Sequence, residues 1–179
     1  MTKTLAGLLV VLFLTCSLRA SAEMPDRAKE TLRDLPGVTV VIEPLQAAAE
    51  HDGLTQHQLQ IDVEQQLRTA GIRVLTHDEW RQTPGSPYLY VNVAALKKNY
   101  GLYAYSIEVC LNQVVTLLRN QHIQEFAETW ETREVGTVGQ DRLSTVRESV
   151  AAHVNTFIRD YRAVNPSSVT VRKHPSGDV

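Results

Sequence analysis

Six histidines are the side chains of this 179-residue sequence best suited to binding a metal or to transferring a proton near neutral pH. None of them forms a His-x-x-x-His pair, which would put two imidazoles on one face of a helix, and the sequence has no Cys-x-x-Cys pair. The groups His51-Asp52 and His77-Asp78-Glu79 flank a predicted helix, where we expect them to be solvated loop residues. The sequence therefore predicts no metal site and no cofactor.

Cys110 could act as a nucleophile only with a base beside it, and no histidine is close to it in the sequence. On the expected strand, Glu108 and Asn112 share its face, and a neighbouring carboxylate disfavours the thiolate. There is no Gly-x-Ser-x-Gly motif, and residues 135–139 (VGTVG) are too short for a nucleotide fingerprint. Three glutamates further on are spaced as on an exposed strand: Glu128, Glu131 and Glu134. These patterns indicate a protein that is not an enzyme.

Composition and charge exclude several classes of protein. Hydrophobic residues make up 43% of the chain and charged residues 21%, which excludes a wholly disordered or collagen-like chain. The formal net charge of −2 excludes a broad nucleic-acid surface, because such a surface needs an excess of Lys and Arg. The length fits one domain, since domains usually have about 100–200 residues.

The first 22 residues have the pattern of an export signal. Lys3 is followed by an apolar run from Leu5 to Leu14, and Ala20-Ser21-Ala22 supplies the small residues that signal peptidase accepts. The apolar run is too short to cross a bilayer, which takes about 20 residues. We therefore expect cleavage after Ala22 and a periplasmic or secreted protein that is not a transmembrane protein.

A lipid anchor at Cys16 is the alternative to release. The residue before a lipidated cysteine is normally Gly, Ala or Ser, and Thr15 fits this rule poorly, so the sequence favours release. Cleavage after Ala22 removes Cys16 and leaves Cys110 as the lone cysteine. No internal disulfide is then expected.

Hydrophobic periodicity predicts an α/β (α+β) two-layer sandwich, in which a mixed sheet of about five strands packs against two main amphipathic helices on one face. We expect a polar segment over residues 23–37, a single domain over 38–164 and a loose tail over 165–179. The predicted strands cover residues 38–42, 72–75, 88–96, 103–117 and 126–135. The predicted helices run from the N-cap Thr55 to Gly71, over one turn at 76–82, and over 143–161, with a loop at 119–124 and a turn at Gly136–Gly139.

The two strongest strands form a hairpin whose register follows from their alternation. Leu89, Val91 and Val93 are apolar on one face of the first strand, as are Ile107, Val109 and Leu111 on the second. A turn centred on Tyr100 makes these sets share a face, with Val93 opposite Ile107.

The other face of this hairpin is small, polar and aromatic, and its candidate binding residues are Tyr88, Tyr90, Asn92 and Asn112. If the last strand keeps the same register, Trp130 joins them and completes an aromatic stripe. If a bulge near Val114-Val115 shifts the register by one residue, Phe126 and Trp130 enter the core instead. The bulged arrangement is favoured, because large aromatic side chains are usually buried.

The run Gly71-Ile72-Arg73-Val74-Leu75 follows an amphipathic helix and precedes a β-hairpin and a final amphipathic helix. In this order of elements, residues 38–164 resemble the N-terminal domain of TolB and the auxiliary lipoproteins of envelope transport systems. The resemblance implies a non-catalytic adaptor in envelope assembly or transport, and it carries over no functional residue.

We therefore expect an exported, non-enzymatic protein that binds another envelope protein through its open sheet face or by strand addition at a sheet edge. The alternative is a small-ligand binder, for a glycan or a lipid, that uses Tyr88, Tyr90 and Trp130. A homodimer joined through an edge strand is a further alternative.

Overall fold

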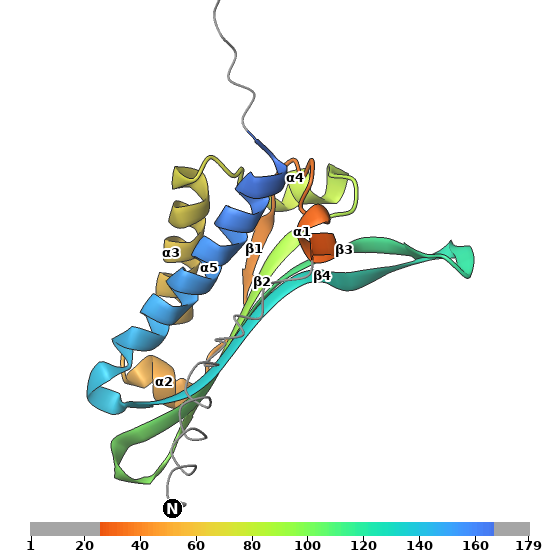
Figure 1. Ribbon diagram of the computed structural model, residues 1–179. Helices are drawn as coiled ribbons and strands as arrows, with labels where there is room; N and C mark the ends of the chain where they lie inside the picture. Colours follow the sequence, from red (N-terminus) through yellow and green to blue (C-terminus); the bar gives the residue numbers. More distant parts are fainter. Residues whose placement is uncertain (1–25, 167–179) are drawn as a thin grey trace, which may run out of the picture.

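The computed structural model describes residues 26–166, which form an α+β fold around one mixed sheet (Figure 1). The strands lie in the sheet in chain order: β1 (Thr39–Ile42), β2 (Tyr88–Lys97), β3 (Leu102–Leu117) and β4 (Asn120–Gly139). β1 runs parallel to β2, and the other two pairs are antiparallel. The predicted mixed sheet with helices is confirmed, but this sheet has four strands where about five were expected.

The expected strand at residues 72–75 makes a single parallel bridge, from Val74 to Val38, just before β1. Further along, the outer carbonyls of β1 accept hydrogen bonds from side-chain amides of helix α3 (Gln56–Thr69). These bonds run from Gln60 to Val40 (3.3 Å) and from Gln56 to Ile42 (2.7 Å). A fifth strand does not extend along β1 because glutamine side chains already occupy its outer edge.

Two long helices, α3 and α5 (Ser144–Val164), lie side by side over one face of the sheet (Figure 1). The shorter helices are α1 (Asp26–Glu30), α2 (Ala47–His51) and α4 (His77–Gln82). Both predicted ends of α3 are confirmed. The Thr55 hydroxyl accepts a hydrogen bond from the backbone N–H of Gln58, and Gly71 follows the helix with a φ of 82°, which favours glycine.

The predicted register of the central hairpin is confirmed. Tyr88 lies opposite Asn112, and Val93 lies opposite Ile107. Leu89 and its apolar neighbours on the same face are fully buried beneath the helices. The opposite side of the sheet, which we call the open face, carries the alternate residues of each strand.

Strand β4 is much longer than predicted, and two predictions around it are wrong. Residues 119–124 are not a loop, because β4 begins at Asn120 and pairs with the end of β3. Gly136 does not begin a turn, because the strand continues to Gly139. Gly136 lies opposite Tyr105, and a Cβ there would stand 2.7 Å from the tyrosine ring, so a larger residue at this position would force the ring to move.

A β-bulge in β4 decides where its two aromatic residues point. Leu111 lies opposite Trp130, whereas the next residue, Asn112, lies opposite Glu128, so that Thr129 is the extra residue of the bulge. Trp130 therefore points into the core beneath the helices, where its side chain is 1% exposed. Of the two predicted arrangements, the bulged one is confirmed for Trp130, and the aromatic stripe through Trp130 is wrong. Phe126, which the bulge was expected to bury, is 42% exposed, because the bulge lies at Thr129 and not near Val114-Val115.

The segment before β1 also packs into the core. Leu32 and Leu35 are buried in the same hydrophobic cluster as the sheet and α5. Asn165, at the end of α5, donates its amide N–H to Leu32 O (2.8 Å) and accepts from the N–H of Asp34 (2.7 Å). Residues 26–37 are therefore tied to both layers of the fold.

Several predictions concern residues outside the described range. These are the export signal over 1–22 with its cleavage after Ala22, the lipid anchor at Cys16, and the tail beyond residue 166. Within residues 26–166, no helix combines the length and the apolarity needed to cross a membrane.

Candidate ligand-binding site

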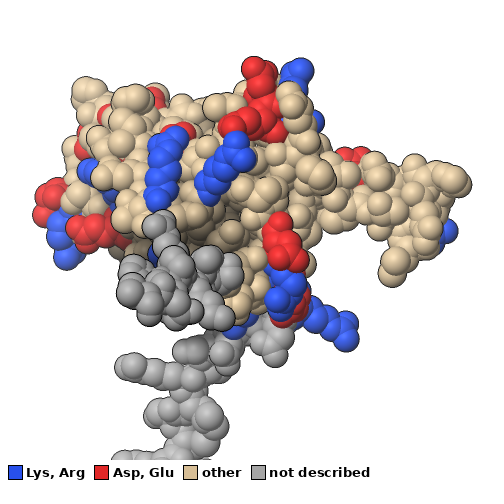
Figure 2. All heavy atoms as spheres, turned by 90° about the horizontal axis from the view of Figure 1, so that it is seen from above, with Lys and Arg blue, Asp and Glu red and all other residues tan. Residues whose placement is uncertain are grey.

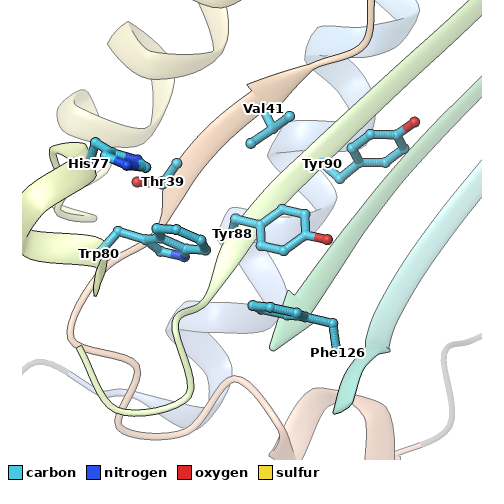
Figure 3. Close-up of a pocket in the computed structure, with 7 residues that line it drawn as sticks. All are labelled: Thr39, Val41, His77, Trp80, Tyr88, Tyr90 and Phe126. Carbon is cyan, nitrogen blue, oxygen red and sulfur yellow. The ribbon is translucent and has the colours of Figure 1, made fainter. Parts of the chain in front are cut away.

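A pocket of about 410 Å³ opens on the open face of the sheet, at the end where α4 lies (Figure 3). Its floor consists of open-face residues of the parallel strands β1 and β2, and its walls come from α4 and from β4. The lining residues are Thr39, Val41, His77, Trp80, Tyr88, Tyr90 and Phe126. Four of these seven residues are Trp, Tyr or Phe, so the pocket surface is mainly aromatic and apolar.

Helix α4 places Trp80 at the side of the pocket. The helix begins with a capping box, in which Thr76 and Glu79 each bind the other's backbone N–H. The indole N–H of Trp80 donates to the backbone oxygen of Ser86 (2.7 Å), in the loop that leads into β2. Because this bond uses the only polar atom of the indole, the ring offers a ligand its apolar surface.

The aromatic rings of the pocket contact one another. The rings of Trp80 and Phe126 are nearly parallel, with centroids 6.3 Å apart, and Tyr88 meets both of them edge-on. His77 stacks on Trp80 with centroids 5.6 Å apart and an interplanar angle of 28°. This mutual packing fixes the rings before any ligand arrives.

Phe126 reaches the pocket because of the bulge at Thr129. Before the bulge, Phe126 lies opposite Val114 and shares the open face with Asn112. After the bulge, Trp130 points to the opposite face. The sequence pattern treated these two aromatic residues as a pair on one face, and the extra residue between them separates the pair.

Two of the residues expected to bind a ligand line the pocket, and two do not. Tyr88 and Tyr90 form part of its floor. Asn92 and Asn112 lie half-buried on the open face outside the lining, and Asn112 donates its amide N–H to the sulfur of Cys110 (3.2 Å). The expectation for Tyr88 and Tyr90 therefore fits the pocket, whereas Trp130 belongs to the core.

Tyr90 links the pocket to a carboxylate. Its hydroxyl donates to Glu43 Oε2 (3.0 Å), just beyond the end of β1. Burial, followed by this hydrogen bond, raises the pKa of Tyr90 to about 12. The phenol therefore stays protonated at neutral pH and holds the carboxylate at the edge of the pocket.

Three carboxylates also gather on the open face, around one arginine. Arg133 Nη2 lies 2.8 Å from Glu108, 3.2 Å from Glu128 and 2.6 Å from Glu131. The oxygens of the three glutamates approach within 4.8 Å of one another, a spacing that a metal ion could use. The guanidinium already supplies the positive charge among them, so the arrangement suits an ion-pair network better than a metal centre.

Cys110 lies beside this network, and its surroundings do not suit a nucleophile. Burial, followed by the nearby Glu128 carboxylate, raises the pKa of the Cys110 thiol to about 12. Burial and the neighbouring Glu131 in turn raise the pKa of Glu128. The thiol is therefore protonated at neutral pH, as expected from the carboxylate beside it in the sequence.

A second polar cluster lies on the helix-covered face, and the sequence pattern missed it. His153, on α5, approaches Thr132 Oγ1 through Nδ1 (2.9 Å) and Glu134 Oε2 through Nε2 (3.2 Å). Glu134 also accepts from the hydroxyl groups of Tyr105 (2.6 Å) and Ser149 (3.3 Å). These groups bind each other and join α5 to β4, which indicates a structural role.

Trp80 and Phe126 are the pocket residues that sequence reasoning did not assign. Trp80 lies in the short helix predicted at residues 76–82, and nothing in its local pattern shows that this helix folds onto the open face. Phe126 could be assigned only with the bulge placed at Thr129. The position of both side chains in the pocket therefore follows from the tertiary structure and not from the local sequence.

Comparison with models of known protein families found no match, and comparison with curated proteins found no similar chain.

Proposed function

We propose that this protein is a non-catalytic binding protein that receives a small ligand with an apolar body in the pocket between α4 and strands β1, β2 and β4. The observation that carries the proposal is the pocket itself: about 410 Å³, lined mainly by aromatic rings. Small-molecule sites usually enclose about 300–1,000 Å³ and have a mostly apolar lining. On the basis of the N-terminal signal pattern, we propose that binding takes place outside the cytoplasm.

The fixed rings favour binding over chemistry. Trp80 is held by its hydrogen bond to Ser86, and Tyr90 by its bond to Glu43. Ordering these side chains on binding costs little entropy, because they are already ordered. Among the described residues that line the pocket, none is serine or cysteine, and the hydroxyl groups there belong to Thr39, Tyr88 and Tyr90.

Titration with N-phenyl-1-naphthylamine, a neutral apolar dye that fluoresces in apolar surroundings, tests the proposal. We expect the wild-type protein to bind the dye and the Trp80→Ala variant to bind it at least about tenfold more weakly, since a large aromatic wall is lost. Tyr100→Ala is the matched control, because Tyr100 is an aromatic residue 99% exposed in the β2–β3 turn.

In the Trp80→Ala variant, emission from the buried Trp130 reports whether the fold is retained. Equal affinities of the folded wild type, Trp80→Ala and Tyr100→Ala would contradict binding in this pocket. Absence of dye binding by the wild type would contradict the proposal as well.

Binding to another envelope protein is a second candidate function, favoured by the end of the β3–β4 hairpin. Residues 114–126, which we call the arm, project from the body of the molecule (Figure 1). The side of the arm seen in Figure 2 bears few charged groups. Leu118 at its tip is 95% exposed, and Ile123 and Phe126 are also exposed. Exposed apolar side chains on a projecting hairpin suit insertion into a partner's groove.

Cross-linking in an envelope extract of the host tests this second function. We expect one dominant partner for the wild type and for Tyr100→Ala, and its loss in Leu118→Asp. If the Leu118→Asp variant is cross-linked to the same proteins as the wild type, docking through the arm is contradicted.

A second copy of the chain could pair with the sheet only at an edge strand, β1 or β4. We expect such pairing at β4, because glutamine side chains occupy the outer carbonyls of β1. Sedimentation velocity of the wild type distinguishes a dimer from a monomer, and a monomer at all concentrations would contradict this pairing.

A further inference from the structure

We infer that the ligand of the aromatic pocket is a small organic cation, with an ammonium group that lies against the rings of Trp80, Tyr88 and Tyr90. This inference rests on the proposed function and adds the charge of the ligand. It follows from two features: the chemistry of the pocket walls and the charges around the pocket.

The pocket walls suit a cation with an apolar surface. The face of an aromatic ring carries partial negative charge, which attracts an ammonium group within about 6 Å of the ring centre, and Trp and Tyr do so best. Trp80, Tyr88 and Tyr90 line the same pocket, and none of the described residues that line it is Lys or Arg. A methylated ammonium group is both apolar at its surface and positively charged, which matches this lining.

The charges of the open face have one predominant sign. Glu43 is hydrogen-bonded to Tyr90 in the pocket floor, so its carboxylate is fixed at the pocket edge. The network further along the open face joins the carboxylates of Glu108, Glu128 and Glu131 to the single guanidinium of Arg133. With Glu43, these strand residues provide four carboxylates and one guanidinium, and helix α4 in the pocket wall adds Asp78, Arg81 and a Glu79 that pairs with Arg73.

This excess of carboxylates distinguishes among classes of ligand. An anionic ligand, such as a fatty acid, would be repelled by Glu43 and by the network. A neutral apolar ligand would fit the lining but would leave the carboxylates without a role. A cation gains from both the rings and the carboxylates, so charge complementarity selects it.

Choline and 3,3-dimethyl-1-butanol form a matched pair of probes for this inference. The alcohol has the same shape as choline, with the charged nitrogen replaced by carbon. Binding is followed through the two indole N–H signals in the ¹⁵N NMR spectrum, one from each tryptophan of the chain. The signal that is lost in Trp80→Phe identifies Trp80.

We expect choline to shift the Trp80 signal and to leave the signal of the buried Trp130 in place. We expect the alcohol to bind about 3- to 30-fold more weakly, the range that cation–π attraction supplies. Glu43→Gln should reduce the affinity for choline and leave that for the alcohol unchanged. The matched control is Glu148→Gln, an exposed glutamate on α5, which covers the opposite face of the sheet.

The outcomes separate this inference from the proposed function. If the alcohol shifts Trp80 as strongly as choline does, the preference for a cation is overturned and the pocket remains a binding site. If neither probe shifts Trp80, the inference is overturned, and the dye titration decides whether the pocket binds anything. Equal choline affinities of the Glu43→Gln and Glu148→Gln variants would also overturn it.

Discussion

The two tryptophans of the chain have different surroundings, one in the core and one in the pocket wall. Trp130 is 1% exposed, meets Phe157 edge-on at 5.2 Å between ring centroids, and donates its indole N–H to the buried Asp160 (3.2 Å). Trp80 lies half-buried at the surface, in the wall of a pocket. We therefore expect replacement of Trp130 to change stability and replacement of Trp80 to change binding.

Trp130→Phe should lower the free energy of unfolding by about 1–3 kcal/mol, because the buried Asp160 carboxylate loses its indole donor and the smaller ring leaves a cavity. Urea unfolding at neutral pH measures this change. Trp80→Phe is the matched control and should cost less than Trp130→Phe. A larger loss of stability in Trp80→Phe than in Trp130→Phe would contradict this assignment of core and pocket.

At the scale of elements, the structure depends on where β4 departs from regular pairing. The bulge at Thr129 puts Trp130 and Phe126 on opposite faces, and Gly136 lets the ring of Tyr105 lie against the strand. The network of Glu134 and His153 then joins the same strand to α5. Strand β4 therefore contributes Trp130 to the core, Phe126 to the pocket wall and Glu134 to the contact with α5.

Gly136→Ala should destabilise the fold by about 1–3 kcal/mol, because its Cβ would overlap the Tyr105 ring and force that ring to move. Thermal or urea unfolding checks this value. The control is Thr137→Ala, at the exposed neighbouring position, where we expect a change within about 0.5 kcal/mol. Equal stabilities of the two variants would contradict the close approach of Tyr105 to the strand.

Glu134 makes the link between β4 and α5 dependent on pH. The hydrogen bond from Tyr105, followed by that from His153, holds the pKa of Glu134 below its ordinary value of 4.5. A carboxylate whose pKa is lowered in the folded state stabilises the fold above the unfolded pKa, and this contribution disappears as pH falls through the folded pKa. Wild-type stability should therefore fall below about pH 4.5.

Glu134→Gln removes this ionisation, so the stability difference between wild type and variant should shrink from pH 7 to acid pH. Urea unfolding at several pH values measures the difference, with the exposed Glu148→Gln as control. A difference that stays constant down to acid pH would contradict the role of the Glu134 carboxylate.

The parts of these elements that could be predicted from sequence depend on local signals. Thr55 and Gly71 mark the ends of α3 by capping chemistry, and the alternation around Tyr100 determines the hairpin register. The usual burial of large aromatic side chains favours a bulge in β4, but no local signal places it at Thr129 rather than near Val114-Val115. The missing strand at 72–75 reflects the contacts of α3 side chains with β1, which only the folded chain reveals.

In the whole molecule, the long helices cover one face of the sheet and leave most of the other face uncovered, and we propose that the ligand binds there. Helices α3 and α5 cover one side of the sheet, and α4 covers only one end of the other (Figures 1 and 3). The open face thereby combines an aromatic pocket with the carboxylates of Glu43, Glu108, Glu128 and Glu131 and the guanidinium of Arg133. Sequence analysis predicted this face and two of its tyrosines, whereas Trp80 and Phe126 reach the pocket through tertiary placement.

The proposed ligand site lies between α4 and strands β1, β2 and β4. The most direct test is to measure nuclear Overhauser effects between isotope-labelled protein and bound N-phenyl-1-naphthylamine. We expect contacts from the dye to the side chains of Trp80, Tyr88 and Phe126. Contacts confined to Leu118 and Ile123, with none to Trp80 or Tyr88, would contradict binding at this site.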